Sequence, residues 1–115
     1  MNNFFERFIN TFNGCNTLIK KDYNFVIHLI SGVIVVISGL ATGITSIEWL
    51  FIVTAIMFVL TTETINTAME TVVDLVTKQY HPLAKKAKDI SAFAVLLSSI
   101  YAIIVGLIIF LPYWF

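Results

Sequence analysis

The sequence predicts an all-α integral membrane protein with three transmembrane helices, preceded by an amphipathic helix at the membrane surface. The first observation is composition: 58% of the 115 residues are hydrophobic and 12% are charged, about half the roughly 25% charged residues of soluble domains. A small domain leaves much of its surface facing solvent, so one globule could not bury this many apolar side chains. The second observation is that the apolar residues form three long runs separated by short polar stretches. We therefore expect a single domain that is mostly surrounded by lipid.

Residues 1–22 are predicted to form the amphipathic helix. Large apolar side chains recur there at spacings of three and four residues, with polar residues between them. A helix of this kind suits the membrane interface, with its apolar face in lipid and its polar face in water. Packing against the other helices is the alternative. The apolar positions are Phe4, Phe5, Phe8, Ile9 and Phe12.

Three later segments are long and apolar enough to cross the hydrocarbon core, which takes about 20 residues. The second segment begins at Trp49, a residue type that is typical of the membrane interface. After it comes a polar stretch containing Pro82, which cannot continue a helix and indicates a turn. The last segment ends near "LPYWF". The predicted elements are spans over residues 25–46, 49–77 and 89–111, with a loop over residues 78–88.

The basic residues predict the orientation of the chain in the membrane. All seven Lys and Arg residues lie within residues 7–21 and 78–88, and the other two polar ends have none. Cytoplasmic loops carry the excess of Lys and Arg. We therefore expect the N-terminus and the loop over residues 78–88 in the cytoplasm, and the C-terminus outside.

The segment "ETINTAMETVVD", residues 63–74, places three acids and an asparagine directly after an apolar run. At 100° per residue, Glu63, Asn66, Glu70 and Asp74 lie within an arc of roughly 80° along about 16 Å of helix. A carboxylate at bilayer depth costs at least about 2.5–3.5 kcal/mol, and such residues mark ion pathways, proton relays or binding sites. The structural alternative is a hydrogen-bond network that only joins helices.

Lysines follow these acids in the loop, at Lys85, Lys86 and Lys88. The repulsion between neighbouring carboxylates has to be offset by protons, lysines or a divalent cation, and Mg²⁺ prefers one or two carboxylates together with phosphate oxygens. Acids for a metal and lysines for phosphates are what phosphoryl transfer requires. The five glycines form no phosphate-binding loop, however. The residues alone therefore leave two classes open, a kinase and a proton- or cation-conducting membrane subunit.

The stretch "ETINTAMETVVDLVTKQYHPLAKKAKDISAFAV" resembles the signature of the prokaryotic diacylglycerol kinase and undecaprenol kinase family. The pattern is E-x-x-N-[ST]-A-x-E-x-x-[VD]-D, followed by H-x-x-x-x-x-A-K-D, and the "HPLAKKAKD" and "FLP" details are similar to Gram-positive undecaprenol kinases. The resemblance implies a bacterial cell-membrane enzyme that uses ATP and Mg²⁺ to phosphorylate a lipid alcohol, undecaprenol first and diacylglycerol as the alternative. It also implies a homotrimer whose active sites are shared between subunits. A catalytically inactive assembly protein is a third class.

The resemblance also implies roles for individual residues. Glu63 matches the catalytic base, which takes the proton of the lipid hydroxyl. The Mg²⁺ ligands would be Glu70 and Asp22, and Asp22 stands where the family usually has Glu. The remaining implied roles are support of the site by Asn66 and Asp74, and nucleotide binding by Asn3, Gln79, Tyr80, His81, Lys88 and Asp89.

Three further positions need an interpretation. Asn3 and Val26 stand where the family often has Arg. His28 lies in the first predicted span near its basic end. We interpret His28 as a hydrogen-bonded packing residue rather than as a ligand.

Overall fold

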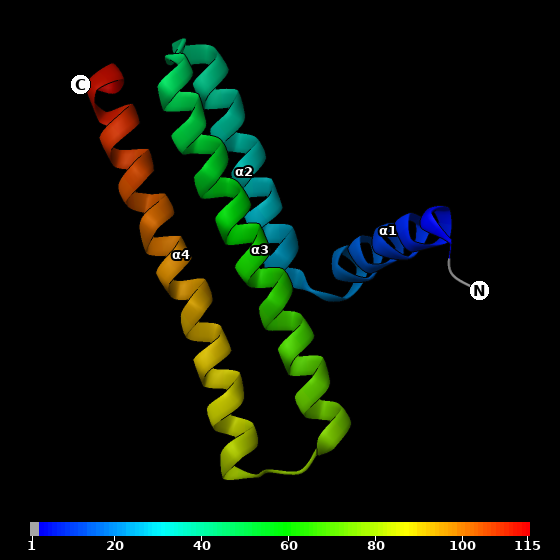
Figure 1. The fold of residues 1–115 in the computed structure, drawn as a ribbon. Helices are drawn as coiled ribbons and strands as arrows, with labels where there is room; N and C mark the ends of the chain where they lie inside the picture. The colour runs from blue at the N-terminus through cyan, green and yellow to red at the C-terminus, as the bar shows by residue number, and fades with distance from the viewer. Residues whose placement is uncertain (1–2) are drawn as a thin grey trace.

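The computed structural model describes residues 3–115, which form four helices: α1 (Phe4–Lys21), α2 (Tyr23–Thr42), α3 (Ser46–Val76) and α4 (Pro82–Trp114). Helices α2, α3 and α4 run alongside one another, whereas α1 leaves the bundle to one side (Figure 1). Each of α2, α3 and α4 is long and apolar enough to cross a membrane. The prediction of an all-helical chain with three apolar spans is therefore confirmed.

The connection between α2 and α3 lies earlier in the chain than the sequence suggested, at residues 43–45 instead of 47–48. Helix α2 ends at Thr42 because Gly43 adopts a left-handed conformation (φ 70°) and its N–H bonds the Gly39 carbonyl, a common helix ending. Helix α3 then begins at Ser46, before the predicted Trp49. Thr45 accepts a hydrogen bond from the Glu48 N–H, and the Glu48 side chain accepts one from the Thr45 N–H. This reciprocal cap satisfies N–H groups that the first helical turn leaves free.

Helix α4 starts at Pro82, so residues 82–88, which were expected in the loop, form its first turns. Proline suits the first position of a helix, where its missing N–H is not needed and its φ angle is already helical. The ring of His81 completes this start, since its Nδ1 accepts a hydrogen bond from the Leu83 N–H (3.1 Å). At its other end α4 continues through Pro112 to Trp114, beyond the predicted limit of 111, because one missing bond in a last turn does not end a helix.

Helix α3 is the centre of the bundle and packs mainly against α4, with a smaller contact to α2. The apolar core lies toward the end of the bundle that holds the α2–α3 turn, and nearer the middle Thr62 and Ser98 form a hydrogen bond of 2.7 Å between α3 and α4. Most other large apolar side chains of the three long helices are exposed, as expected for helices surrounded by lipid. The core residues are Ile44, Ile52, Ala55, Val105, Ile109 and Phe110.

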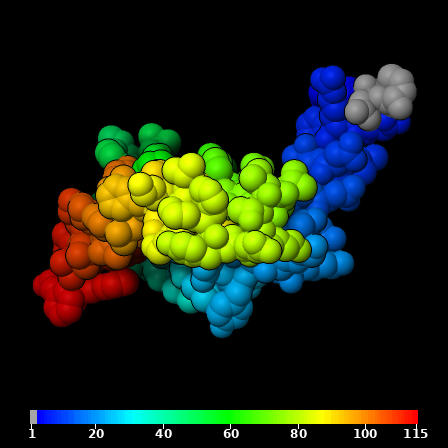
Figure 2. Space-filling model, turned by 90° about the horizontal axis from the view of Figure 1, so that it is seen from below, coloured from blue at the N-terminus to red at the C-terminus, as the bar shows by residue number. Residues whose placement is uncertain are grey.

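The opposite end of the bundle carries the α3–α4 loop. Seen from this end, the loop and the first turns of α4 face the viewer, and α1 projects well away from them (Figure 2). Helix α1 has no buried residue. The structure therefore gives the bundle a polar end, formed by the loop, and an opposite end closed by the α2–α3 turn and the C-terminus.

The close packing of α2 on α3 depends on Gly39. A Cβ atom at Gly39 would lie 2.8 Å from the Trp49 ring, whereas one at Gly14 in α1 would meet nothing within 4 Å. We expect Gly39→Leu to force α2 away from α3 and to destabilise the protein by about 1–3 kcal/mol, the usual range for overpacking. Thermal unfolding of the purified variant in detergent measures the change.

Gly14→Leu is the matched control, since the same side chain enters open space there. Its melting temperature should equal or exceed that of the natural protein. Equal melting temperatures for both variants would show that the contact between Gly39 and Trp49 does not limit the packing of these helices.

Candidate active site

The four polar residues of the α3 stripe become steadily more exposed toward the loop end. Glu63 is 3% exposed and Asn66 is 8% exposed, Glu70 is half-buried, and Asp74 is exposed. Helix α3 is continuous through all four positions. The stripe therefore leads from the buried middle of the bundle to its polar end.

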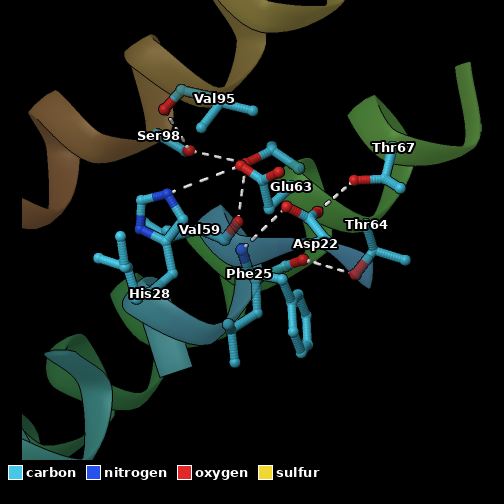
Figure 3. Close-up of polar contacts among 12 residues, drawn as sticks. Asp22, Phe25, His28, Val59, Glu63, Thr64, Thr67, Val95 and Ser98 are labelled. Atoms are coloured by element: carbon cyan, nitrogen blue, oxygen red, sulfur yellow. Dashed lines mark hydrogen bonds and ion pairs between the residues drawn. The ribbon is translucent and has the colours of Figure 1, made fainter. Parts of the chain in front are cut away.

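Glu63, the most buried residue of the stripe, faces the beginning of α2. His28 Nε2 lies 3.6 Å from Glu63 Oε1, and the two side chains point toward each other beside Ser98 of α4 (Figure 3). This separation is longer than that of a hydrogen bond. The Glu63 carboxyl group therefore lies between α3 and α2, where the polar residues of the stripe end and the apolar part of α3 begins.

Asp22 reaches the same region from the junction of α1 and α2. Its carboxylate accepts hydrogen bonds from the Phe25 N–H (3.2 Å) and from the hydroxyl of Thr67 on α3 (Figure 3). Burial by itself raises the pKa of Asp22, but the hydrogen bonds, of which that from Thr67 is the strongest, outweigh it and hold the pKa below its ordinary value. Asp22 is therefore an ionised carboxylate at neutral pH, and it fastens α2 to the stripe.

The middle and end of the stripe are held by the first turns of α4. The Ser91 hydroxyl lies 2.7 Å from Asn66 Oδ1 and 3.1 Å from the Lys88 carbonyl oxygen. The Lys88 ammonium group donates to Asp74 Oδ1 at 2.8 Å. These contacts bring Lys88 to the stripe, as the order of motifs along the chain suggested.

A hollow of about 230 Å³ lies at the polar end, between the α3–α4 loop and the start of α4. Its wall includes five of the six residues predicted to bind nucleotide. Among them Asp89 is paired with Lys85 at 2.6 Å, which leaves a mixture of positive and negative charge around the opening. The five residues are Gln79, Tyr80, His81, Lys88 and Asp89.

Asn3, the sixth residue, is not part of this wall. Its side chain caps α1 by accepting a hydrogen bond from the Glu6 N–H (2.9 Å). The N-terminal end of α1 lies away from the α3–α4 loop in both views (Figures 1 and 2). Within one chain, the structure therefore does not bring Asn3 to the hollow.

The acids of the stripe and Asp22 are candidate metal ligands. Within residues 3–115, no group of three or more His, Cys, Asp or Glu side chains has the arrangement of a metal site. An all-protein cage is thus absent from this part of the chain. Asp22 and Glu70 each offer one carboxylate, and Mg²⁺ is a cation that takes one or two carboxylates together with phosphate oxygens and water.

Two residues at the site, Thr67 and Ser91, were not given a role by the sequence: Thr67 contacts Asp22 and Ser91 contacts Asn66. His28, which was interpreted as a packing residue, contacts Glu63. Each contact joins two helices. The periodicity of one helix cannot indicate such a pair, although Thr67 lies inside the motif on which the resemblance depends.

Comparison with known proteins identifies the family. The prokaryotic diacylglycerol kinase family matches residues 9–110. Undecaprenol kinase of Bacillus subtilis is 38% identical over 112 residues, which cover 97% of this chain and 91% of that protein. Diacylglycerol kinase of Synechocystis is 43% identical over 90 residues, 77% of this chain and 51% of that protein. Diacylglycerol kinase of Escherichia coli is 36% identical over 61 residues, 53% and 50% of the two chains. The family resemblance seen in the sequence is therefore correct: this chain belongs to the prokaryotic diacylglycerol kinase family and is a lipid kinase.

Proposed function

We propose that the protein transfers the γ-phosphate of ATP to the hydroxyl group of undecaprenol in a bacterial cell membrane, with Mg²⁺ as cofactor. The observation that carries the proposal is the stripe on α3, which joins buried Glu63 to Lys88 and the polar hollow. A lipid hydroxyl group needs apolar surroundings for its hydrocarbon chain, and the phosphates of a nucleotide need polar ones. The stripe connects two such regions. The similarity to undecaprenol kinase over nearly the whole chain favours undecaprenol as the alcohol.

Glu63 is the base in this reaction. As the hydroxyl oxygen forms a bond to the γ-phosphorus, its proton passes to the Glu63 carboxylate. The bond between the γ-phosphorus and the oxygen that bridges it to the β-phosphate breaks, and ADP leaves with that electron pair. A positioned base contributes about 10²–10⁴-fold to a rate, and a lipid alcohol needs one because it holds its proton tightly.

The polar end of the stripe handles the nucleotide. Lys88 would turn from Asp74 toward the phosphates, and the loop residues that line the hollow would contact the rest of ATP. Asp22 and Glu70 would hold Mg²⁺, which when bound supplies positive charge to the phosphate oxygens. Asn66, fixed by Ser91, and Asp74 keep the surrounding side chains in position.

The proposed setting is a homotrimer with α1 at the cytoplasmic membrane surface. The Phe side chains of α1 are exposed, and the rings of Phe4 and Phe8 contact each other with centroids 5.0 Å apart. Exposed neighbouring aromatic side chains suit a helix at the membrane interface. The hollow of about 230 Å³ is smaller than the roughly 300–1,000 Å³ of typical ligand pockets, which favours completion of the nucleotide site by a second subunit. Because Asn3 does not line the hollow of its own chain, it would contact the nucleotide bound by a neighbouring subunit.

Diacylglycerol kinase activity is the second candidate, because two relatives that match more than half of this chain carry that name. A proton- or cation-conducting subunit is not favoured, since the relatives are kinases. The deciding experiment measures transfer of labelled γ-phosphate from ATP to undecaprenol and to diacylglycerol in the same detergent. We expect undecaprenol to be the better substrate by kcat/KM; a preference for diacylglycerol would move the protein to the second candidate, and no transfer to either would remove both.

Replacement of the base tests the chemistry. We expect Glu63→Gln to lower kcat by about 10²–10⁴-fold, because the amide keeps the shape of the side chain and cannot take the proton. The KM for ATP should change much less than kcat, because Glu63 acts on the lipid hydroxyl whereas Lys88 and the loop residues of the hollow hold the nucleotide. Phosphate-transfer assays on the purified variant give both values, and retained kcat would show that Glu63 is not the base.

Replacement of Lys88 tests the nucleotide site. We expect Lys88→Met to raise the KM for ATP about tenfold or more, since a charge-assisted bond to phosphate is worth about 1.5–3 kcal/mol. The matched control is Lys86→Met, because Lys86 is exposed on the same turn and does not line the hollow. Equal KM values for the two variants would place ATP elsewhere.

A further inference from the structure

A second and larger cavity, about 450 Å³, lies on the surface of α3 between α2 and α4. We call it the apolar groove. Most of its wall is hydrocarbon, contributed by all three long helices, and small residues on α2 and α4 keep it open. Representative wall residues are His28 and Gly32 from α2, Val59 from α3, and Ala102, Gly106 and Trp114 from α4.

The apolar groove begins beside the proposed base. His28 belongs to its wall and also lies 3.6 Å from Glu63. Val59 lies about one helical turn from Glu63 on α3. From this end the groove follows α4 toward Trp114, at the end of the bundle opposite the lysines. His28 therefore lies between the buried Glu63 carboxyl group and the apolar groove.

Gly106 leaves open space in the apolar groove. A Cβ atom added to Gly106 would meet nothing within 4 Å, whereas one added to Gly32 would lie 3.2 Å from Ile56 Cγ2. Gly32 is therefore explained by helix packing and Gly106 is not. Gly106 follows Ser99 of the groove wall by two helical turns, about 10 Å. A larger side chain there would close the far part of the groove without disturbing the helices.

We propose that the apolar groove holds the hydrocarbon chain of the lipid alcohol and that His28 is a positioning residue, which orients Glu63 toward the hydroxyl group. This inference rests on the proposed function. A hydroxyl group at Glu63 must have its chain in apolar surroundings, and the groove can supply them because its wall includes His28, the neighbour of Glu63. Gly106 then determines specificity for chain length.

The groove also favours one class of alcohol. A polyprenol carries its hydroxyl directly on the hydrocarbon chain, whereas a diacylglycerol places two ester groups next to it. Near His28 the wall offers the hydroxyls of Ser31 and Ser99, and Ser31 already donates to the Ile27 carbonyl at 2.9 Å. The Ser99 hydroxyl could then serve one ester group of a glyceride and not both. Buried ester oxygens without donors are costly. The chemistry of the wall thus fits a polyprenol better than a glyceride.

The experiment compares a long and a short alcohol on Gly106→Leu. The long one is undecaprenol; the short one is dimethylallyl alcohol, whose chain ends before Gly106 when its hydroxyl lies at Glu63. We expect kcat/KM for undecaprenol to fall about tenfold or more, as blocked apolar contacts usually cause, and kcat/KM for dimethylallyl alcohol to stay within about twofold. Ala94→Leu is the matched control, because Ala94 is exposed on α4 and does not line the groove; both alcohols should react normally with it.

The outcomes are distinct. If the natural protein phosphorylates undecaprenol and Gly106→Leu does so equally well, the chain lies elsewhere and the inference is wrong while the proposed function stands. If Gly106→Leu changes the oligomeric mass measured by light scattering, the groove receives a helix of another subunit instead. If the natural protein phosphorylates neither alcohol, both proposals fail.

His28 is tested by a pair of variants. We expect His28→Leu to lower kcat for both alcohols about tenfold or more, because a reacting group displaced by about 1 Å can lose about 10²-fold in rate. His28→Gln should recover part of this loss, because its amide can still donate to Glu63. The KM for ATP should not change in either variant. Equal kcat values for His28→Leu and the natural protein would remove His28 from the positioning role, and a common loss of ATP binding would mark it as structural.

Discussion

Polar groups on a helix that is surrounded by hydrocarbon need partners, and the arrangement of this protein follows from that constraint. An unpaired carboxylate or amide costs several kcal/mol in such surroundings. Three of the four residues of the α3 stripe therefore have a neighbour on another helix: Glu63 contacts His28, Asn66 contacts Ser91 and Asp74 contacts Lys88. Within residues 3–115, every fully buried side-chain nitrogen or oxygen has a hydrogen-bond partner. These contacts determine how α2 and α4 are rotated and at what depth they pack on α3.

The same contacts separate two environments along one helix. Toward the loop, α3 and α4 present charges, and Lys88 and Asp89 line a polar hollow. Toward the other end, α2, α3 and α4 present apolar side chains around the groove. Glu63 lies where the two meet. A reaction between a lipid alcohol and a nucleotide needs such a boundary, because neither reactant is soluble in the surroundings of the other.

The isolated chain leaves most of its large apolar side chains exposed. Lipid can cover these surfaces, and so can other copies of the chain. Interfaces between membrane helices depend on close backbone approach through small residues, and here Gly32 and Gly39 are already used within the chain by Ile56 and Trp49. The polar hollow, by contrast, is open, and it is at this end that a neighbouring subunit would contribute to chemistry.

The sequence by itself determined the helices and the order of the site along the chain. Length and composition predicted three spans, and helical periodicity placed Glu63, Asn66, Glu70 and Asp74 on one face. Both signals are local, because they depend on residues within one helix. The prediction from sequence was wrong where one residue type suits two local structures. Pro82 was predicted to lie in a loop, but it begins α4, because proline also suits the first turn of a helix.

The tertiary structure alone decided which helices meet at the site. It placed His28, interpreted as a packing residue, beside Glu63, showed a hydrogen bond from Thr67 to Asp22, and left Asn3 outside the wall of the hollow. It also created the apolar groove, whose walls come from three helices. Such features depend on the relative rotation, depth and tilt of packed helices, and these are set by contacts between side chains far apart in the sequence, which no single helix records.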